Sequence, residues 1–155
     1  MIKTINLGNK KESIEALNTF KEKIGIARYI RIINSNIRDL NKVIGRNVFK
    51  KDALYINSQS LWEIMQPAGG RGAHNYHGLT PEQVYDALSR LQYAKDVFTS
   101  YRDRYIVITD VVFIGDVYLI VIVTPESDVP SQKLKNIITI ITIYPSDKDW
   151  CKNKK

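Results

Sequence analysis

The chain is poor in the residues that build disulfides and many metal sites. Its 155 residues include one cysteine, Cys151 in a lysine-rich tail, and two histidines, His74 and His77. A single cysteine excludes an intramolecular disulfide and a cysteine-based zinc site. We therefore expect no redox chemistry, and any histidine chemistry must come from one short segment.

Long apolar runs, low-complexity tracts and internal repeats are also absent. No run approaches the ~20 residues that a membrane span needs, and the first residues lack the apolar segment of a secretory signal. With 44% hydrophobic and 25% charged residues, the composition is that of a folded globular chain. We expect one domain over residues 1–155, not bound to a membrane, in the cytoplasm or delivered into the cytoplasm of a target cell.

Positive charge is concentrated in the first part of the chain. Residues 1–60 hold 12 Lys and Arg against 5 Asp and Glu, whereas residues 61–155 hold 11 of each, so the first part carries the whole net charge of +7. This surplus suits a polyanionic partner, because each Lys or Arg that neutralises a phosphate releases condensed counterions. Solvated lysines on covering helices would give the same count.

The spacing of apolar residues in the first 65 positions is mainly helical. A repeat from Ile14 to Ile24, followed by Gly25, predicts a helix over about 10–24. A second repeat predicts a helix over about 26–45, with a break near the sequence NSN; its members are Ile30, Ile33, Ile37, Leu40 and Ile44. The run ALYI then predicts a short strand, and Ser58 or Ser60 a helix N-cap.

The strongest helix start is LTPEQ, residues 79–83. Thr80 is a suitable N-cap, Pro81 suits the first helical position, and Gln83 completes a capping box. From about residue 97 the pattern changes to β-branched and aromatic runs separated by short turns. Such short connections favour hairpins, so we predict an α+β fold with N-terminal helices packed on a roughly four-stranded antiparallel sheet.

The segment RGAHNYHG, residues 71–78, is the main candidate for chemistry. Histidine is the side chain that can give and take protons near neutral pH, so His74 and His77 are a candidate acid and base beside Arg71. A surface loop without function is the simpler alternative.

Three other kinds of site fit the sequence poorly. The histidine pair lacks the glutamate of HExxH zinc sites, and a third ligand would have to come from Asp110 or Asp116. There is no G-x-S-x-G nucleophile elbow. The stretch GGRG lacks the Lys-Ser/Thr of a P-loop. We expect no metal and no cofactor.

The order of these elements resembles phage and polymorphic-toxin members of the metal-independent RNase superfamily, which includes barnase, EndoU, colicin and RelE-like nucleases. The resemblance covers roughly residues 55–146 and rests on element order and on the segments HGLTPEQVYDAL, RYIVITD, VYLIVIV and IITIITIYP. It implies a microbial RNase or RelE-like fold, with a basic helical part over about 1–60, a nuclease-like core over about 55–146 and a polar tail over 147–155.

The resemblance also implies RNA cleavage without metal, in which the ribose 2′-hydroxyl attacks the adjacent phosphate and leaves a 2′,3′-cyclic phosphate. His74 or His77 would then be the base or acid, Arg71 the phosphate clamp, and the last strand would supply Thr142 and Tyr144. RNA is the implied partner, together with a cognate inhibitor or immunity protein. The glutamate base of barnase has no obvious counterpart, so the division between acid and base stays open.

Alternation along the last strand supports one part of this site. With a period of two, Thr142 and Tyr144 share a face with Ile138 and Ile140 and can point together into a site. Further candidates for contact with RNA are Arg102, Arg104, Tyr105, Thr139 and Ser146. Alternatively, the strand residues have no role in a site and are only good β-formers on a half-exposed face, and Arg102 and Arg104 belong to an ordinary solvated turn.

The leading hypothesis is a small, metal-independent endoribonuclease of phage or toxin type. A non-catalytic nucleic-acid-binding or phage accessory module on the same fold is the main rival. An immunity or antitoxin-like protein is a third possibility, but its expected acidic surface disagrees with the positive charge.

Overall fold

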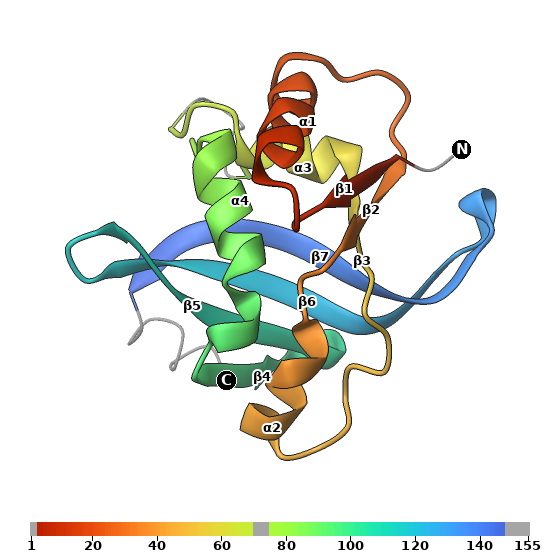
Figure 1. The fold of residues 1–155 in the computed structure, drawn as a ribbon, viewed down its shortest axis with the longest axis vertical. Helices are drawn as coiled ribbons and strands as arrows, with labels where there is room; N and C mark the ends of the chain where they lie inside the picture. The colour runs from red at the N-terminus through yellow and green to blue at the C-terminus, as the bar shows by residue number, and fades with distance from the viewer. Residues whose placement is uncertain (1–2, 70–74, 148–155) are drawn as a thin grey trace.

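A mixed β-sheet forms the centre of the fold in a computed structural model, which describes residues 3–69 and 75–147 (Figure 1). Within these residues the sheet has seven strands in the order β1-β2-β3-β7-β6-β5-β4. The strands are β1 (Thr4–Asn6), β2 (Tyr29–Ile33), β3 (Leu54–Asn57), β4 (Asp96–Ser100), β5 (Arg104–Ile114), β6 (Val117–Val129) and β7 (Leu134–Asp147).

The predicted four-stranded antiparallel sheet covered by N-terminal helices is wrong. Strands β4 to β7 do form an antiparallel meander, but β3 pairs parallel to β7 and extends the sheet. Beyond it, β2 is antiparallel to β3 and β1 is parallel to β2. The basic first part of the chain therefore contributes three strands to the sheet besides its helices.

The second predicted helix accounts for much of this error. Its first half is strand β2, in which Ile30 and Ile32 are buried while Arg31 points the other way. Asn34 and Asn36 then adopt left-handed backbone angles, with φ of 68° and 55°, which end the strand. A 3-10 turn and the short helix α2 (Leu40–Ile44) follow. Isoleucines three or four residues apart satisfy a helical pattern, but β-branching also suits strands.

The other helices begin where local capping allows. Helix α1 (Lys10–Glu22) starts at Asn9, whose side chain accepts a hydrogen bond from the Glu12 N–H. Helix α3 (Ser58–Ile64) is capped by Asn57 rather than by either predicted serine. Helix α4 (Pro81–Ser89) has the predicted capping box between Thr80 and Gln83, so this prediction is confirmed.

Helices α1, α2 and α4 pack on one face of the sheet, the helix face, whereas α3 follows β3 directly and lies beside β7, with Leu61 and Ile64 in the core and Ser60 and Glu63 toward the other side. Figure 1 shows α4 crossing in front of β5, β6 and β7. The helices bury apolar side chains against the strands, among them Leu17, Leu40, Leu61, Leu88, Leu54, Val121 and Ile138. Burial of each such side chain contributes about 1.5–3 kcal/mol, so this layer is the main core.

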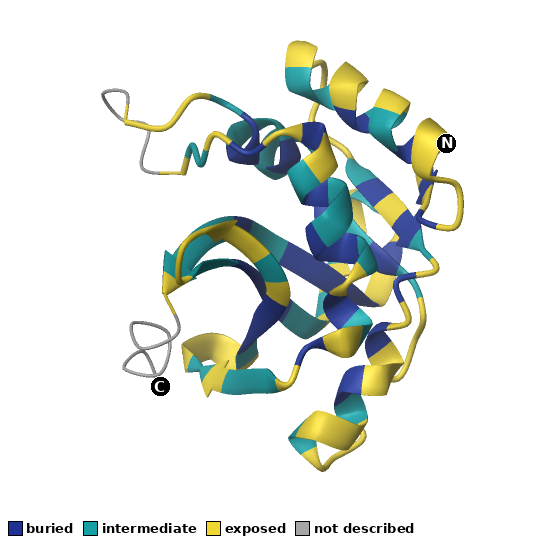
Figure 2. Ribbon diagram, turned by 60° about the vertical axis from the view of Figure 1, so that its left-hand side comes forward, coloured by how far each residue is buried: buried dark blue, intermediate teal, exposed yellow. Residues whose placement is uncertain are grey.

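The opposite side of the sheet, the open face, has a second and smaller apolar cluster. The sheet is strongly curled, with the helices on one side of it (Figure 2). On the other side, four isoleucines at positions 106, 108, 120 and 122 are buried, and Phe98, Tyr118, Ile141 and Tyr144 pack around them. The open face thus combines a buried centre with half-buried aromatic side chains.

Candidate functional site

A β-bulge in β7 decides which side chains reach the open face. Ile122 pairs with Thr142 while the next residue, Val123, pairs with Ile140, so Ile141 is an extra residue. Before the bulge Ile138 and Ile140 lie in the main core, and after it Ile143 does. Thr142 and Tyr144 therefore share the open face as predicted, but Ile138 and Ile140 lie on the other one. Bulges often redirect side chains beside functional sites.

His77 faces this part of β7. Its ring lies with a centroid 5.6 Å from that of Tyr144, tilted by 37°. The backbone that follows it is attached to the end of α3, because the Gly78 N–H donates to the Gln66 carbonyl at 2.7 Å and the Leu79 N–H to the Ile64 carbonyl at 3.1 Å. Gly78 has φ of 66°, a conformation that glycine adopts without strain. The histidine is therefore held over the last strand and not over open water.

A groove of about 950 Å³ surrounds this pair. Its polar wall is formed by Asn75, His77, Thr142, Tyr144, Ser146 and Asp147. Its other wall is apolar and comes from the β5–β6 hairpin, where Phe113 and Ile114 are exposed, and from Tyr101, of which 68% is exposed. Exposed aromatic side chains beside polar groups are what a base-stacking surface needs.

A second hollow of about 340 Å³ adjoins the groove, since Asn75 and Thr142 line both. It adds Ser60 and Glu63 from α3 and Arg104 from the start of β5. The sequence did not identify Glu63 because it lies in α3, fourteen positions before His77. The open face therefore brings a histidine, a carboxylate and a guanidinium to one place.

Burial lowers the pKa of His77 below its ordinary value of 6.5, and the negative charge of Glu63 opposes this shift. Desolvation acts in this direction because it disfavours the charged imidazolium. The imidazole is therefore neutral at neutral pH and can accept a proton. The Glu63 carboxylate would stabilise the cation that forms when it does so.

A row of polar side chains, the polar row, crosses six strands of the open face near Arg104. Cα pairing joins Arg31 with Tyr55, Tyr55 with Thr139, Thr139 with Thr124, and Arg104 with Ser100. Val123 pairs with Tyr105 in the antiparallel ladder of β5 and β6, so the next position along places Thr124 opposite Arg104. This pair connects the two halves of the row. At roughly 4.8 Å between strands, the row extends over about 24 Å.

Of the polar row, Arg31 is exposed, whereas Thr139 is 6% exposed. The Thr139 hydroxyl has no hydrogen-bond partner within residues 3–69 and 75–147. Contact between the row and a ligand would therefore come from the neighbours of Thr139.

The turn between β4 and β5 carries the two predicted arginines. Arg102 and Asp103 both have left-handed backbone angles, with φ of 60° and 57°, which costs roughly 1–2 kcal/mol per residue. The guanidinium groups of Arg102 and Arg104 lie 5.6 and 5.7 Å from the centroid of the Tyr101 ring. The strained turn thus presents an exposed aromatic ring close to two cations, a combination suited to a nucleotide.

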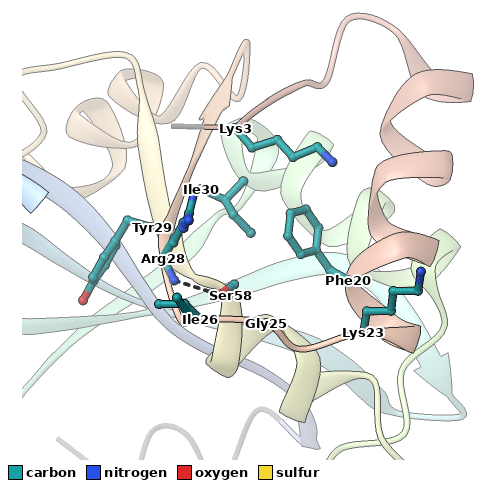
Figure 3. A pocket seen from close by; sticks show the side chains of 9 residues that line it. All are labelled: Lys3, Phe20, Lys23, Gly25, Ile26, Arg28, Tyr29, Ile30 and Ser58. Carbon is teal, nitrogen blue, oxygen red and sulfur yellow. Dashed lines mark hydrogen bonds between the residues drawn. The ribbon is translucent and has the colours of Figure 1, made fainter. Parts of the chain in front are cut away.

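A further cavity of about 300 Å³ lies apart from the groove, between α1, β2 and the start of α3 (Figure 3). It shares no lining residue with the groove or with the adjoining hollow. His77 does not line it.

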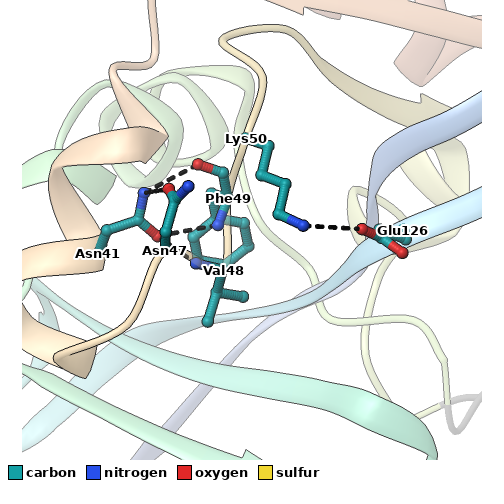
Figure 4. Close-up of polar contacts among 6 residues, drawn as sticks. All are labelled: Asn41, Asn47, Val48, Phe49, Lys50 and Glu126. Atoms are coloured by element: carbon teal, nitrogen blue, oxygen red, sulfur yellow. Dashed lines mark hydrogen bonds and ion pairs between the residues drawn. The ribbon is translucent and has the colours of Figure 1, made fainter.

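Tyr105 does not take part in the groove. It is buried on the helix face, where its hydroxyl accepts a hydrogen bond from Arg46 at 2.9 Å and its ring packs edge-on against Phe49. Asn41 holds this region with four hydrogen bonds to Asn47, Val48 and Phe49 (Figure 4). Tyr105 is thus part of the core packing.

The remaining predicted residues divide into two groups. Ser146 lines the groove, and its hydroxyl lies 3.4 Å from the Asp147 carbonyl. Arg71 and His74 lie outside the described residues. Of the predicted catalytic set, the described structure therefore brings together His77, Thr142 and Tyr144.

Comparisons with protein-family models, with curated proteins and with solved structures each found no match. Within the described ranges, no three His, Cys, Asp or Glu side chains gather as ligands for a metal ion. None of the helices in the same ranges is long and apolar enough to span a membrane.

Proposed function

We propose that this protein is a metal-independent endoribonuclease whose active site is the groove on the open face. The observation that carries the proposal is the position of His77 over Tyr144, beside a hollow that contains Glu63 and Arg104. Cleavage by an adjacent 2′-hydroxyl needs a base, an acid and groups that stabilise the charge on phosphorus. These four side chains, with Thr142, supply each of the three.

His77 is the base in this proposal. Neutral imidazole accepts the proton of the 2′-hydroxyl as the 2′ oxygen forms a bond to phosphorus, and Glu63 stabilises the imidazolium. The bond between phosphorus and the 5′ oxygen breaks, and the Tyr144 hydroxyl gives that oxygen its proton. The imidazolium then returns a proton to the phenolate, which leaves the enzyme unchanged and the RNA with a 2′,3′-cyclic phosphate.

Arg104 and Thr142 bind the phosphate. A guanidinium offers paired donors that match phosphate oxygens, and Thr142 lines both the groove that contains His77 and the adjoining hollow that contains Arg104. Tyr101 would stack against a base next to the cleaved bond. The polar row offers Arg31 and Tyr55 to nucleotides farther along a single strand.

The test is incubation of the purified chain with total RNA in EDTA. Cleavage that persists with chelator, ends in 2′,3′-cyclic phosphates and falls at least a hundredfold in His77→Ala supports the proposal, since acid–base catalysis contributes 10²–10⁴-fold. Glu63→Gln and Arg104→Gln should also reduce the rate. Arg38→Gln is the matched control, because Arg38 is exposed and pairs with Asp52 away from the groove. Equal cleavage by the wild type and His77→Ala contradicts the assignment.

A non-catalytic nucleic-acid-binding module is the second candidate, favoured by the polar row alone. It predicts that the wild type binds single-stranded RNA with salt-dependent affinity and leaves it intact. In that case Arg31→Gln and Arg104→Gln weaken binding, whereas His77→Ala leaves it unchanged. Intact RNA after prolonged incubation would favour this candidate over the nuclease.

A further inference from the structure

The cavity between α1, β2 and the start of α3 has an apolar floor. Figure 3 shows Phe20 and Ile30 pointing toward one another across it, from α1 and β2. Ile30 is buried, Phe20 is half-buried, and Ile26 at the edge is 82% exposed. Its volume of about 300 Å³ is at the lower limit of small-ligand pockets. An apolar body of a small molecule fits such a space.

The rim of the cavity is basic. Lys3, Lys23 and Arg28 line it, and none of its nine lining residues is acidic. Among the described residues, the ion pairs involve other cations, so these three carry no ion-paired carboxylate. The Lys3 ammonium lies 5.4 Å from the centroid of the Phe20 ring, directly above the apolar floor.

The polar groups of the cavity are mainly hydrogen-bond donors. The backbone of Arg28 is tied to α3 by two bonds, one from its N–H to the Ser58 hydroxyl oxygen at 2.9 Å and one from the Ser58 N–H to its carbonyl at 2.7 Å. The hydroxyl oxygen of Ser58 accepts in this pairing, which leaves its proton to donate. Donors and cations around an apolar floor require a ligand that is an acceptor at one end and apolar at the other.

We propose that this cavity binds a small amphipathic anion, with its apolar body between Phe20 and Ile30 and its carboxylate or phosphate head at Lys3, Lys23 and Arg28. The charge of the rim selects the head, and the floor selects the body. This site is separate from the groove on the open face and does not depend on RNA cleavage.

The test uses ¹H–¹⁵N NMR titration of the full chain with four ligands that have the same octyl chain. Octanoate and octyl phosphate should shift the amide signals of Gly25, Ile26 and Ser58 saturably, and the tighter of the two identifies the head group. 1-Octanol should bind at least tenfold more weakly, and octyltrimethylammonium should not bind at this site.

Charge variants locate the head group. Lys23→Glu and Arg28→Glu should each weaken binding of the anions at least tenfold, and both residues are exposed, so the fold should tolerate the change. Lys11→Glu is the matched control, on helix α1, which ends just before Lys23; Lys11 lies outside the cavity, so the change should alter the affinity less than twofold. RNA cleavage should be unaffected by Lys23→Glu, which separates this test from that of the nuclease.

Four results would overturn the proposal. They are octanol binding as tightly as the anions, shifts spread over the whole surface, equal effects of Lys11→Glu and Lys23→Glu, and shifts of the same amides by an RNA oligonucleotide without any response to the octyl anions.

Discussion

The helix face of the sheet carries an almost uninterrupted apolar layer, whereas the open face has a small apolar cluster among charged and hydroxyl side chains. The first arrangement stabilises the fold. The second leaves Glu63, His77 and Arg104 beside half-buried aromatic rings. Strand β7 contributes side chains to both faces. Its bulge shifts their alternation, so that Ile140 and Ile143 lie in the main core while Ile141 lies on the open face.

The sharpest contrast between the faces is expected from two neighbouring isoleucines at the bulge. Ile140 is 1% exposed in the main core, whereas Ile141 is half-buried on the open face. Ile140→Ala should lower the free energy of unfolding by about 2–5 kcal/mol, as buried truncations do, and Ile141→Ala by about 1 kcal/mol. Urea denaturation of both variants measures this. Equal losses would mean that the bulge does not separate the faces.

RNA cleavage, unlike stability, should depend on the residues of β7 that lie on the open face and not on those in the core. Thr142→Val keeps the shape of the side chain but removes the hydroxyl from both hollows, and should reduce RNA cleavage about tenfold with little loss of stability. Ile143→Val in the core should cost about 0.5–1.5 kcal/mol of stability and leave cleavage unchanged. Initial rates and urea midpoints for the pair provide the comparison, and a slower rate in Ile143→Val alone would reverse it.

The open face should also respond to pH through His77. Because burial lowers its pKa in the folded state below 6.5, the unfolded state takes up the proton first as the pH falls. This contribution to stability is present in full above about pH 6.5 and is lost as the pH falls toward the lower folded value. The free energy of unfolding, measured by denaturation between pH 5 and 8, should therefore rise with pH, and this rise should be smaller in His77→Gln.

An NMR titration of His77 tests the role of Glu63 directly. Since the carboxylate raises the pKa of His77 against the effect of burial, Glu63→Gln should lower that pKa further. An unchanged pKa would place Glu63 too far away to assist the base.

The smallest effect is expected at an exposed ion pair on the helix side. Arg90 donates two hydrogen bonds to Asp110, and this pairing lowers the pKa of Asp110. Its contribution is present above the ordinary carboxyl pKa and is lost as the pH falls through the lowered value. Both side chains are nearly half exposed, so Asp110→Asn should change the stability at pH 7 by less than about 1 kcal/mol. A larger loss would show that surface charge contributes to the fold.

The sequence predicted correctly those elements that depend on neighbouring residues alone. The capping box at Thr80 and the four β-branched runs of the meander needed no distant partner to be recognised. Strand β2 was missed because Ile30 and Ile33 fit both a helix and a strand, and only pairing with β3 decides between them. The addition of β3 to β7 is likewise a long-range event.

The site was predictable only in part for the same reason. The chemistry of histidine and the alternation of Thr142 and Tyr144 identified three members of the groove. Glu63 carries no local signal, because its relation to His77 depends on how α3 and the following loop pack against β7. The bulge at Ile141 is also invisible in a run of isoleucine and threonine, where either register is compatible with the residue types.

The central position of β7 has a consequence for the order in which the fold assembles. Its pairing of Leu54 with Ile138 closes a long loop of chain, and such contacts of high sequence separation form slowly. On the ribosome, β3 emerges well before its partner, so the groove cannot be assembled until β7 has been synthesised. A nascent chain without β7 would therefore lack Thr142 and Tyr144, and with them one wall of the groove.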